Sequence, residues 1–440
     1  MKTPICDFVR RYAESDALRL HMPGHKGCVF LGCEGLDITE FDGADSLYEA
    51  SGIIAESEAN ASRLFGCDTF YSTEGSSQCI RAMLYLAMLD AKNRGKTPKI
   101  AAGRNAHKTF LSAAALLDLD VVWIYPERGE SYLACDVTEA YLEEILLREK
   151  PAAVYLTSPD YLGSVAEIGA LAAACHRHGA MLLVDNAHGA YLKFLPESRH
   201  PMDLGADLCC DSAHKTLPVL TGGAYLHVAD RVLAKQAKMA LALFGSTSPS
   251  YLILQSLDRA NAYLADCAEV LHPFLEKVRQ LKEKLKANGW QLRDQEPLKV
   301  TIAAKPLGYR GEELAACLLE RGIVCEFADP DYLVLMLTPE VGEEGLKRLE
   351  DVLLAIARRA SIDDQPPRLH RAERGMSIRE AAFSPSQLLP VEQCPGRILA
   401  AATVGCPPAV PILVCGERID EHAIACFRYY GIEQCAVIME

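Results

Sequence analysis

Basic residues are scarce in this sequence relative to acidic ones. Lys and Arg total 45 against 59 Asp and Glu, and the formal net charge is −14. An excess of negative charge repels phosphate backbones, so we exclude nucleic acid as a partner. Hydrophobic residues make up 50% of the chain and charged residues 24%, which is the profile of a folded soluble protein and excludes general disorder.

Metal-binding cysteine motifs are also missing. The chain has 17 cysteines, yet no two of them have C-x-x-C spacing, and Cys209 and Cys210 lie next to each other in an apolar run. We therefore expect most thiols to be small core residues and expect no structural metal site. Their odd number, and the lack of a secretory leader before Cys6, favour a reducing cytoplasm.

Only one uncharged stretch, residues 398–416, is long enough to raise the question of a membrane span. Pro407, Pro408 and Pro411 lie inside it and would break a helix. We expect a buried loop that leads into a strand, and no membrane contact.

Short apolar runs alternate with segments of helical period between residues 99 and 228. The runs are KIAAG, VVWIY, AAVYLT, MLLVD, ADLCC and GAYLHV, and the helical segments are 108–117, 137–148 and 166–178. Repeated strand–helix units build a mostly parallel sheet flanked by helices, so the pattern predicts an α/β fold.

The rest of the chain predicts additional units. Residues 251–286 have few helix breakers and are expected to form one long helix. After Gly289 the pattern restarts with expected strands at 299–304, 323–327 and 332–337 and helices at 312–321 and 342–358. The expected domains are an N-terminal segment with a large domain (1–288), a small α+β domain (289–360) and a C-terminal domain (376–440), the last preceded by a linker (361–375).

Two of the strand ends carry residues suited to cofactor chemistry. Lys215 lies in DSAHKTLPVLT after an apolar run, where a lowered pKa would make it a nucleophile able to form a Schiff base; a surface lysine in a loop is the alternative. Asp185 ends the strand MLLVD, where a carboxylate can keep a pyridine nitrogen protonated; capping of the next helix is the alternative.

Two helix starts complete the pattern. STEGSSQ, residues 72–78, precedes an expected helix at 79–90 whose N-terminus could bind a phosphate ester, or could simply be capped. His107, between a strand and a helix, could lie flat against a planar cofactor, or be structural. In chain order these elements are a phosphate anchor, a stacking group, a pyridine partner and a Schiff-base lysine, which together favour a pyridoxal phosphate (PLP) site.

The residues within the motifs point to one family of PLP enzymes. The sequence resembles the ornithine/lysine/arginine decarboxylase family, whose members have the PLP-dependent aspartate aminotransferase fold, fold type I. The resemblance extends over almost the whole chain, through HMPGHKG (21–27), GRNAHKTF (103–110), TSPDYLG (157–163), VDNAHGAY (184–191), SAHKTLPVLTGGAYLHV (212–228), STSPSYLILQSLD (246–258) and VGCPPAVPILVCGE (404–417). Large bacterial members have an N-terminal wing domain; because HMPGHKG begins at residue 21, the short form without this wing is expected.

The resemblance implies decarboxylation of arginine, lysine or ornithine to a polyamine-pathway amine and CO2, with PLP as cofactor, in a cytoplasmic homodimer or larger homo-oligomer. It implies that Lys215 binds the cofactor, that Asp185 contacts its pyridine nitrogen and that His107 stacks on its ring. It places five further residues beside the cofactor: Ser76, Ser77, Ala187, Ser212 and His214. Either His107 or Lys215 could return the proton to the α-carbon.

Three positions depart from the family pattern: Glu74 replaces an Asn in the phosphate turn, Asn186 replaces a Glu, and Gly222 replaces a Gln. These departures put the choice of substrate and the catalytic efficiency in doubt. Two alternatives stay open. The chain could be another fold-type-I enzyme (an aminotransferase or a different lyase), or a catalytically silent regulatory paralogue. A cationic substrate also needs an acid at the far end of its pocket. The candidates are Asp42, Asp45, Glu49 and Glu417. For each of them a solvated surface position is expected more often than a place in the pocket.

Overall fold

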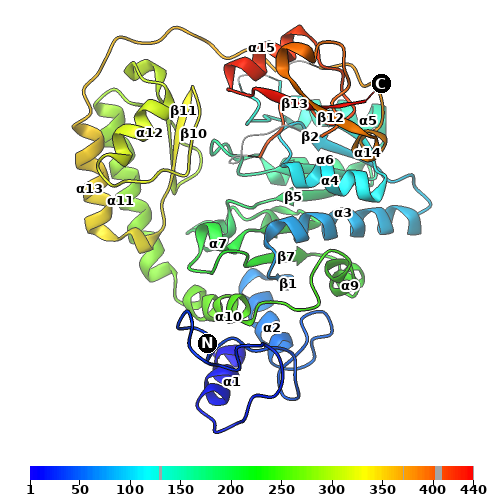
Figure 1. Ribbon diagram of the computed structural model, residues 1–440, viewed down its shortest axis with the longest axis vertical. Coiled ribbons are helices and arrows are strands. Elements are labelled where there is room, and N and C mark those ends of the chain that lie inside the picture. The colour runs from blue at the N-terminus through cyan, green and yellow to red at the C-terminus, as the bar shows by residue number, and fades with distance from the viewer. Residues whose placement is uncertain (128–130, 370, 402–408, 440) are drawn as a thin grey trace. The chain divides into compact units, whose positions relative to one another are not determined.

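The computed structural model describes residues 1–127, 131–369, 371–401 and 409–439 (Figure 1). The chain divides into two compact units. Unit 1 comprises Met1–Pro98, Ala152–Val154 and Ile168–His272, and unit 2 comprises Lys99–Pro151, Tyr155–Glu167 and Pro273–Glu440. Strand β4 (Ala153–Thr157) and helix α11 (Ala268–Ala287) are divided between the two.

Unit 1 consists of strands that carry long helices and short connecting turns. Its strands are β1 (Asp68–Ser72), β5 (Met181–Asp185), β6 (Leu208–Asp211) and β7 (Ala224–Val228). Its helices are α1 (Pro4–Ala13), α2 (Ile53–Phe65), α3 (Gly75–Asn93), α6 (Ile168–Arg177), α7 (Ala213–Thr216), α8 (Arg231–Ala234), α9 (Ala237–Ala242) and α10 (Tyr251–Ala265), with 3-10 turns η1 (Ala190–Phe194) and η2 (Pro201–Leu204).

The strands of unit 1 lie in the order β1-β7-β6-β5. β5 and β6 are parallel, whereas β7 is antiparallel to both β6 and β1. Every residue of β5, β6 and β7 is buried, as expected for short apolar strands covered on both faces. This arrangement brings the carboxyl ends of β5 and β6 to one edge of the sheet.

Unit 2 contains the remaining elements. Its strands are β2 (Lys99–Gly103), β3 (Asp120–Ile124), β8 (Gln291–Arg293), β9 (Lys299–Ala303), β10 (Phe327–Ala328), β11 (Tyr332–Met336), β12 (Ser386–Pro390) and β13 (Gln434–Ile438). Its helices are α4 (Lys108–Leu117), α5 (Glu139–Glu149), α12 (Gly311–Leu319), α13 (Gly342–Leu354), α14 (Ile378–Phe383) and α15 (Glu421–Tyr429), with 3-10 turns η3 (Lys305–Leu307), η4 (Pro339–Val341) and η5 (Val391–Gln393).

Three groups of strands organise unit 2. β2 and β3 are parallel, β10-β11-β9-β8 form an antiparallel sheet, and β12 pairs with β13. A small core near the C-terminus packs α15 and β13 together through Phe427, Cys435 and Val437, all buried. The predicted α/β fold with a mostly parallel sheet is confirmed; the predicted domain boundaries stay a prediction.

Two expected elements were wrong. Residues 251–286 form two helices, because α10 ends at Ala265, where the N–H of Asp266 bonds the Tyr263 carbonyl three residues back. Pro273, which has no N–H to donate, lies in the following helix. Of the strand expected at 323–327 only Phe327 is extended, in the two-residue strand β10, since Val324 is 81% exposed and the apolar run is not buried.

In the described part of the chain, no helix combines the length and the apolar character needed to cross a membrane. The loop expected at 398–416 falls partly on residues 402–408, including Pro407 and Pro408, which lie outside the described residues. The cysteines that are described are free thiols.

Candidate active site

Asp185 is the last residue of β5 and is 2% exposed. Its side-chain oxygen Oδ1 accepts a hydrogen bond from the N–H of Ala187 at 3.2 Å and one from the thiol of Cys210 at 3.6 Å. Because Asp185 pairs with Cys210 in the parallel register, the chain that follows each strand leaves the sheet at the same edge. Residues after β5 and after β6 can therefore act on one ligand.

Lys215 lies in the single helical turn α7, which follows β6. Its Nζ is 3.0 Å from Nε2 of His188, and His188 is buried. His188 comes three residues after Asp185, so the segment that leaves β5 meets the lysine that follows β6. Sequence reasoning quoted His188 inside a motif and gave it no role; its place in the motif, directly after Ala187, was the available signal.

The expected phosphate anchor is the start of α3. This helix begins at Gly75, four residues earlier than expected, so Ser76 and Ser77 belong to its first turn, where backbone N–H groups have no partner within the helix. The hydroxyl of Ser212 donates to Ser76 Oγ at 2.7 Å. The turn between β6 and α7 and the start of α3 therefore meet through two of the predicted residues.

Two more predicted residues lie in the same part of unit 1. His214 contacts the carbonyl oxygen of Gly223 through both its backbone N–H, at 3.2 Å, and its ring Nδ1, at 3.0 Å. Ala187 is buried at 7% exposure. Unit 1 thus brings together Ser76, Ser212, His188 and Lys215 by direct contacts and holds Asp185, Ala187 and His214 on the adjoining turns.

His107 belongs to unit 2, where it caps α4. Its Nδ1 accepts a hydrogen bond from the N–H of Thr109 at 3.2 Å, which is the structural alternative foreseen for this residue. The stacking role of His107 stays a prediction.

Near His107, Arg104 is fully buried and donates to the carbonyl oxygens of Pro411 at 2.9 Å and Ile412 at 2.8 Å. It also pairs with Glu417 at 3.3 Å, and the N–H of Val414 donates to the same carboxylate at 2.8 Å. Glu417 was expected to be solvated or to bind a substrate cation. The solvated interpretation was wrong, because the carboxylate is 4% exposed and its charge is compensated by Arg104; binding of a substrate cation stays a prediction.

Asp45 was also expected to be solvated, and it is buried. Its carboxylate accepts backbone N–H groups of the turn before α2 and of the first turn of α2: Ser46, Ser51, Gly52, Ile54 and Ala55. Burial alone would raise the pKa of Asp45, but these hydrogen bonds hold it below its ordinary value. Asp42 and Glu49 are exposed, as expected.

Comparison with known proteins shows which family the chain belongs to. A model of the Orn/Lys/Arg decarboxylase major domain matches residues 3–304, and a model of the C-terminal domain of the same family matches residues 374–436. The chain belongs to the Orn/Lys/Arg decarboxylase family. Membership confirms the expected class: the chain is a PLP-dependent amino-acid decarboxylase of fold type I.

Individual relatives within and around the family are distant. The uncharacterized protein YaaO of Bacillus subtilis is 30% identical, with 96% of this chain and 93% of that protein aligned. An arginine decarboxylase of the same organism is 27% identical over 96% and 92%. Among solved structures, lysine decarboxylase A of Pseudomonas aeruginosa has a TM-score of 0.81 at 18% identity, covering 100% of this chain and 80% of that one.

The decarboxylase residues of unit 1 fit the PLP cofactor. A phosphate ester needs hydrogen-bond donors and positive potential, and the first turn of α3 with the hydroxyls of Ser76 and Ser212 supplies both. The aldehyde needs an amine, which Lys215 would supply. The pyridine nitrogen needs a buried acid, and Asp185 is one.

The three departures from the family pattern each have a structural account. Glu74 is the N-cap residue of α3, and its carboxylate accepts a hydrogen bond from the backbone N–H of Ser246. Gly222 has a φ of +102°, and a Cβ there would lie 2.8 Å from the Thr73 carbonyl oxygen, so a Gln at this position would be strained. The side chain of Asn186 donates to Asp211 at 2.6 Å.

Proposed function

We propose that this decarboxylase acts on a basic amino acid, with arginine as the first candidate, and releases CO2 and the corresponding amine. Relatives of similar length that are named arginine decarboxylase support arginine: one from Bacillus subtilis and one, 28% identical, from Halalkalibacterium halodurans. Lysine and ornithine are the competing substrates of the same class.

The observation that carries the proposal is the contact of Lys215 with His188, which brings the segment after Asp185 to the lysine amine. In the proposed roles Lys215 holds the cofactor aldehyde covalently, Asp185 keeps its ring nitrogen protonated, and Ser76, Ser77, Ser212 and His214 hold its phosphate. Ala187 packs beneath the ring and His107 stacks on it. PLP, when bound, accepts the electron pair of the broken C–C bond.

His188 has a proposed role as well. At 3.0 Å, its Nε2 can accept a proton from the Lys215 amine or return one to it. An uncharged amine is the nucleophilic form that the cofactor aldehyde requires. Lys215 or His107 would then protonate the α-carbon of the product.

A homodimer is part of the proposal. Residues 18–31 of unit 1 expose large apolar side chains, among them Leu18 and Leu20 at 81%, Phe30 at 78% and Leu31 at 90%. A segment with several exposed large apolar side chains favours burial against another chain. We also propose a cytoplasmic location, in keeping with the free thiols.

The domain division 1–288, 289–360 and 376–440, with a linker at 361–375, remains part of this proposal. It is supported by the separate antiparallel sheet of β8–β11 and by the C-terminal family match at 374–436.

The test is incubation of the purified protein with PLP and, separately, arginine, lysine and ornithine, measuring CO2 and amine. We expect one substrate to dominate. A Lys215→Ala variant should lose turnover and the visible absorbance of the covalently bound cofactor, whereas Lys235→Ala, at an exposed lysine, should keep both. Formation of a keto acid would indicate an aminotransferase, and neither product nor absorbance would indicate a silent paralogue.

A further inference from the structure

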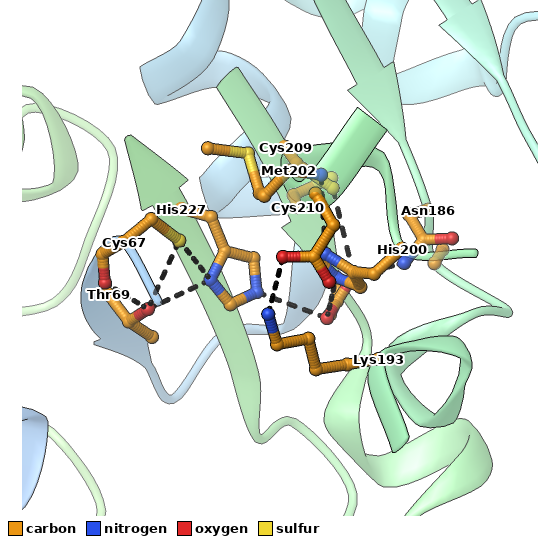
Figure 2. A network of polar contacts seen from close by, with 12 residues as sticks. Cys67, Thr69, Asn186, Lys193, His200, Met202, Cys209, Cys210 and His227 are labelled. Atoms are coloured by element: carbon orange, nitrogen blue, oxygen red, sulfur yellow. Dashed lines mark hydrogen bonds and ion pairs between the residues drawn. The ribbon is translucent and has the colours of Figure 1, made fainter. Parts of the chain in front are cut away.

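A buried carboxylate in unit 1 gathers three side chains from separate segments. Asp211 Oδ2 lies 3.1 Å from Nε2 of His200 and 3.1 Å from Nε2 of His227, and Asp211 Oδ1 accepts the Asn186 amide at 2.6 Å. All four residues are 0% exposed. We call these four residues the Asp211 cluster; Figure 2 shows Asn186, His200 and His227 with their neighbours.

Hydrogen bonds on the far sides of the two imidazole rings assign their protons. His200 Nδ1 accepts the N–H of Met202 at 3.4 Å, so its proton is on Nε2 and is donated to Asp211. The hydroxyl of Thr69 donates to the Cys67 carbonyl at 3.2 Å and lies 2.9 Å from His227 Nδ1, so it accepts from that nitrogen. On this assignment we infer that His227 carries a proton on both nitrogens and that its positive charge balances Asp211.

The electrostatics agree with this assignment. Burial would raise the pKa of Asp211, but the hydrogen bonds from His200 and His227, together with the charge of His227, hold it well below its ordinary value. Burial would lower the pKa of His227, but Asp211 raises it above the ordinary value. The nearby Lys193 is paired with Asp203 at 2.5 Å and so is not the counter-ion of Asp211.

Metal binding is the competing interpretation, since ligand atoms of His200, Cys209 and Asp211 lie within 4.8 Å of one another. Two features oppose it. The Nε2 of His200 holds a proton where a metal would need its lone pair, and burial raises the pKa of Cys209 well above its ordinary value, so its sulfur is a neutral thiol.

The place of the cluster in the chain gives it a role. Asn186 directly follows Asp185, and Asp211 is the last residue of β6, four residues before Lys215. The backbone N–H of Asn186 also donates to the Cys210 carbonyl at 3.0 Å. The hydrogen bond between Asn186 and Asp211 therefore ties together the two strand ends from which Asp185 and Lys215 extend.

We propose that Asp211 is a positioning residue that, through Asn186, holds Asp185 and Lys215 at the spacing needed to engage one PLP molecule. This inference rests on the proposed function, because it assumes the roles of those two residues. It also explains why this chain has Asn in place of Glu at position 186: an ionised Glu cannot donate to the Asp211 carboxylate.

The test exchanges the two groups. Asn186→Asp places one carboxylate against another and should weaken PLP binding to the apoenzyme by about tenfold or more, equivalent to about 1.4 kcal/mol. Adding Asp211→Asn restores a donor–acceptor pair with the direction reversed, and should recover most of the affinity. Affinity is read from absorbance during titration with PLP.

The matched control is Asp258→Asn, which neutralises another buried acid of unit 1 that accepts from Ser57 at 2.6 Å and from the N–H of Cys6 at 2.9 Å. It should change thermal stability and leave PLP affinity unchanged. Unchanged affinity in Asn186→Asp, or no recovery in the double variant, overturns the proposal. Absence of PLP binding by the unmodified protein overturns the proposed function instead.

A second measurement does not depend on PLP. Nitrogen-15 NMR of the histidine rings in the apoprotein should show His227 protonated at both nitrogens near neutral pH, and should lose that signature in Asp211→Asn. A neutral His227 in the unmodified protein contradicts the assignment. Added Co2+ should produce no thiolate band; one ion per chain with a band that disappears in Cys209→Ser would establish a metal site and overturn the proposal.

Discussion

Both units contain a fully buried ion pair, yet the two pairs differ in one respect that matters. In the Asp211 cluster of unit 1 the cation that we infer is the His227 imidazolium, which can release its proton. In unit 2 the cation is the Arg104 guanidinium, which keeps its proton at any pH a protein tolerates. If Asp211 is removed, the imidazolium can lose its proton, so that no unpaired charge stays buried. If Glu417 is removed, the guanidinium stays charged and buried without a counter-ion.

The sharpest way to break this comparison is to neutralise each acid with its amide. Glu417→Gln should lower the free energy of unfolding by about 3–5 kcal/mol, because the Arg104 charge stays buried without a counter-ion. The loss should be the same from about pH 6 to pH 9, measured by urea denaturation. Arg104→Met combined with Glu417→Gln should recover part of it, since no charge then remains buried; a double variant worse than the single one would contradict this.

Asp211→Asn should lower the free energy of unfolding by a smaller amount, roughly 2 kcal/mol near pH 6. The raised pKa of His227 contributes stability that is complete below its ordinary value of 6.5 and is lost as pH rises through the folded value. The lowered pKa of Asp211 contributes stability that is present above 3.8 and is lost only in strong acid. The deficit of the variant should therefore shrink from pH 6 to pH 9, and a flat profile would rule out an imidazolium.

An acid with no ion-pair partner among the described residues sharpens the comparison further. Asp329 in unit 2 accepts the N–H groups of Asp331 and Tyr332, but its Oδ2 is buried without a hydrogen-bond partner among the described residues. Burial raises the pKa of Asp329 to about 7. The protonated carboxyl therefore contributes stability that is complete below pH 3.8 and is lost as the pH rises toward 7. Between pH 5 and pH 8 the unmodified protein should lose about 2 kcal/mol relative to Asp329→Asn. Parallel pH profiles of the two proteins would contradict this.

An exposed acid gives the baseline. Glu74→Gln keeps an oxygen to accept the N–H of Ser246 and removes only an exposed charge, so we expect a change below about 0.5 kcal/mol in thermal unfolding. A loss comparable to that of Glu417→Gln would mean that burial does not set the scale of these effects.

Short buried strands were predicted well because burial on both faces requires an unbroken apolar run. KIAAG and MLLVD coincide with β2 and β5 residue for residue. β1, with the sequence DTFYS, was missed because its polar residues pair with β7 and are satisfied by tertiary contacts that no local pattern reveals. The break between α10 and α11 was missed because a helix can end on a local 3-10 bond without a Gly or Pro at that point.

The residues of the candidate site also fall into those that the sequence predicted and those that it did not. Lys215, Asp185 and Ser76 stand at strand and helix boundaries, where position along the chain already suggests chemistry, and their roles stay predictions. His188 was given no role although it stands in a recognised motif, and the Asp211 cluster could not be found from the sequence, since its side chains meet across different segments. His227 occupies an ordinary strand position and His200 precedes a short turn, and only the fold shows that they share one carboxylate.

The anchoring of Arg104 has a consequence for the order in which the protein matures during synthesis. Its acceptors at Pro411 and Ile412 are made 307 and 308 residues later, an interval of roughly 15–60 s on the ribosome. Until then the Arg104 guanidinium, three residues before His107, lacks the carbonyl oxygens to which it donates in the folded protein. The loop that carries this histidine is among the earlier parts to be translated and among the last to be completed.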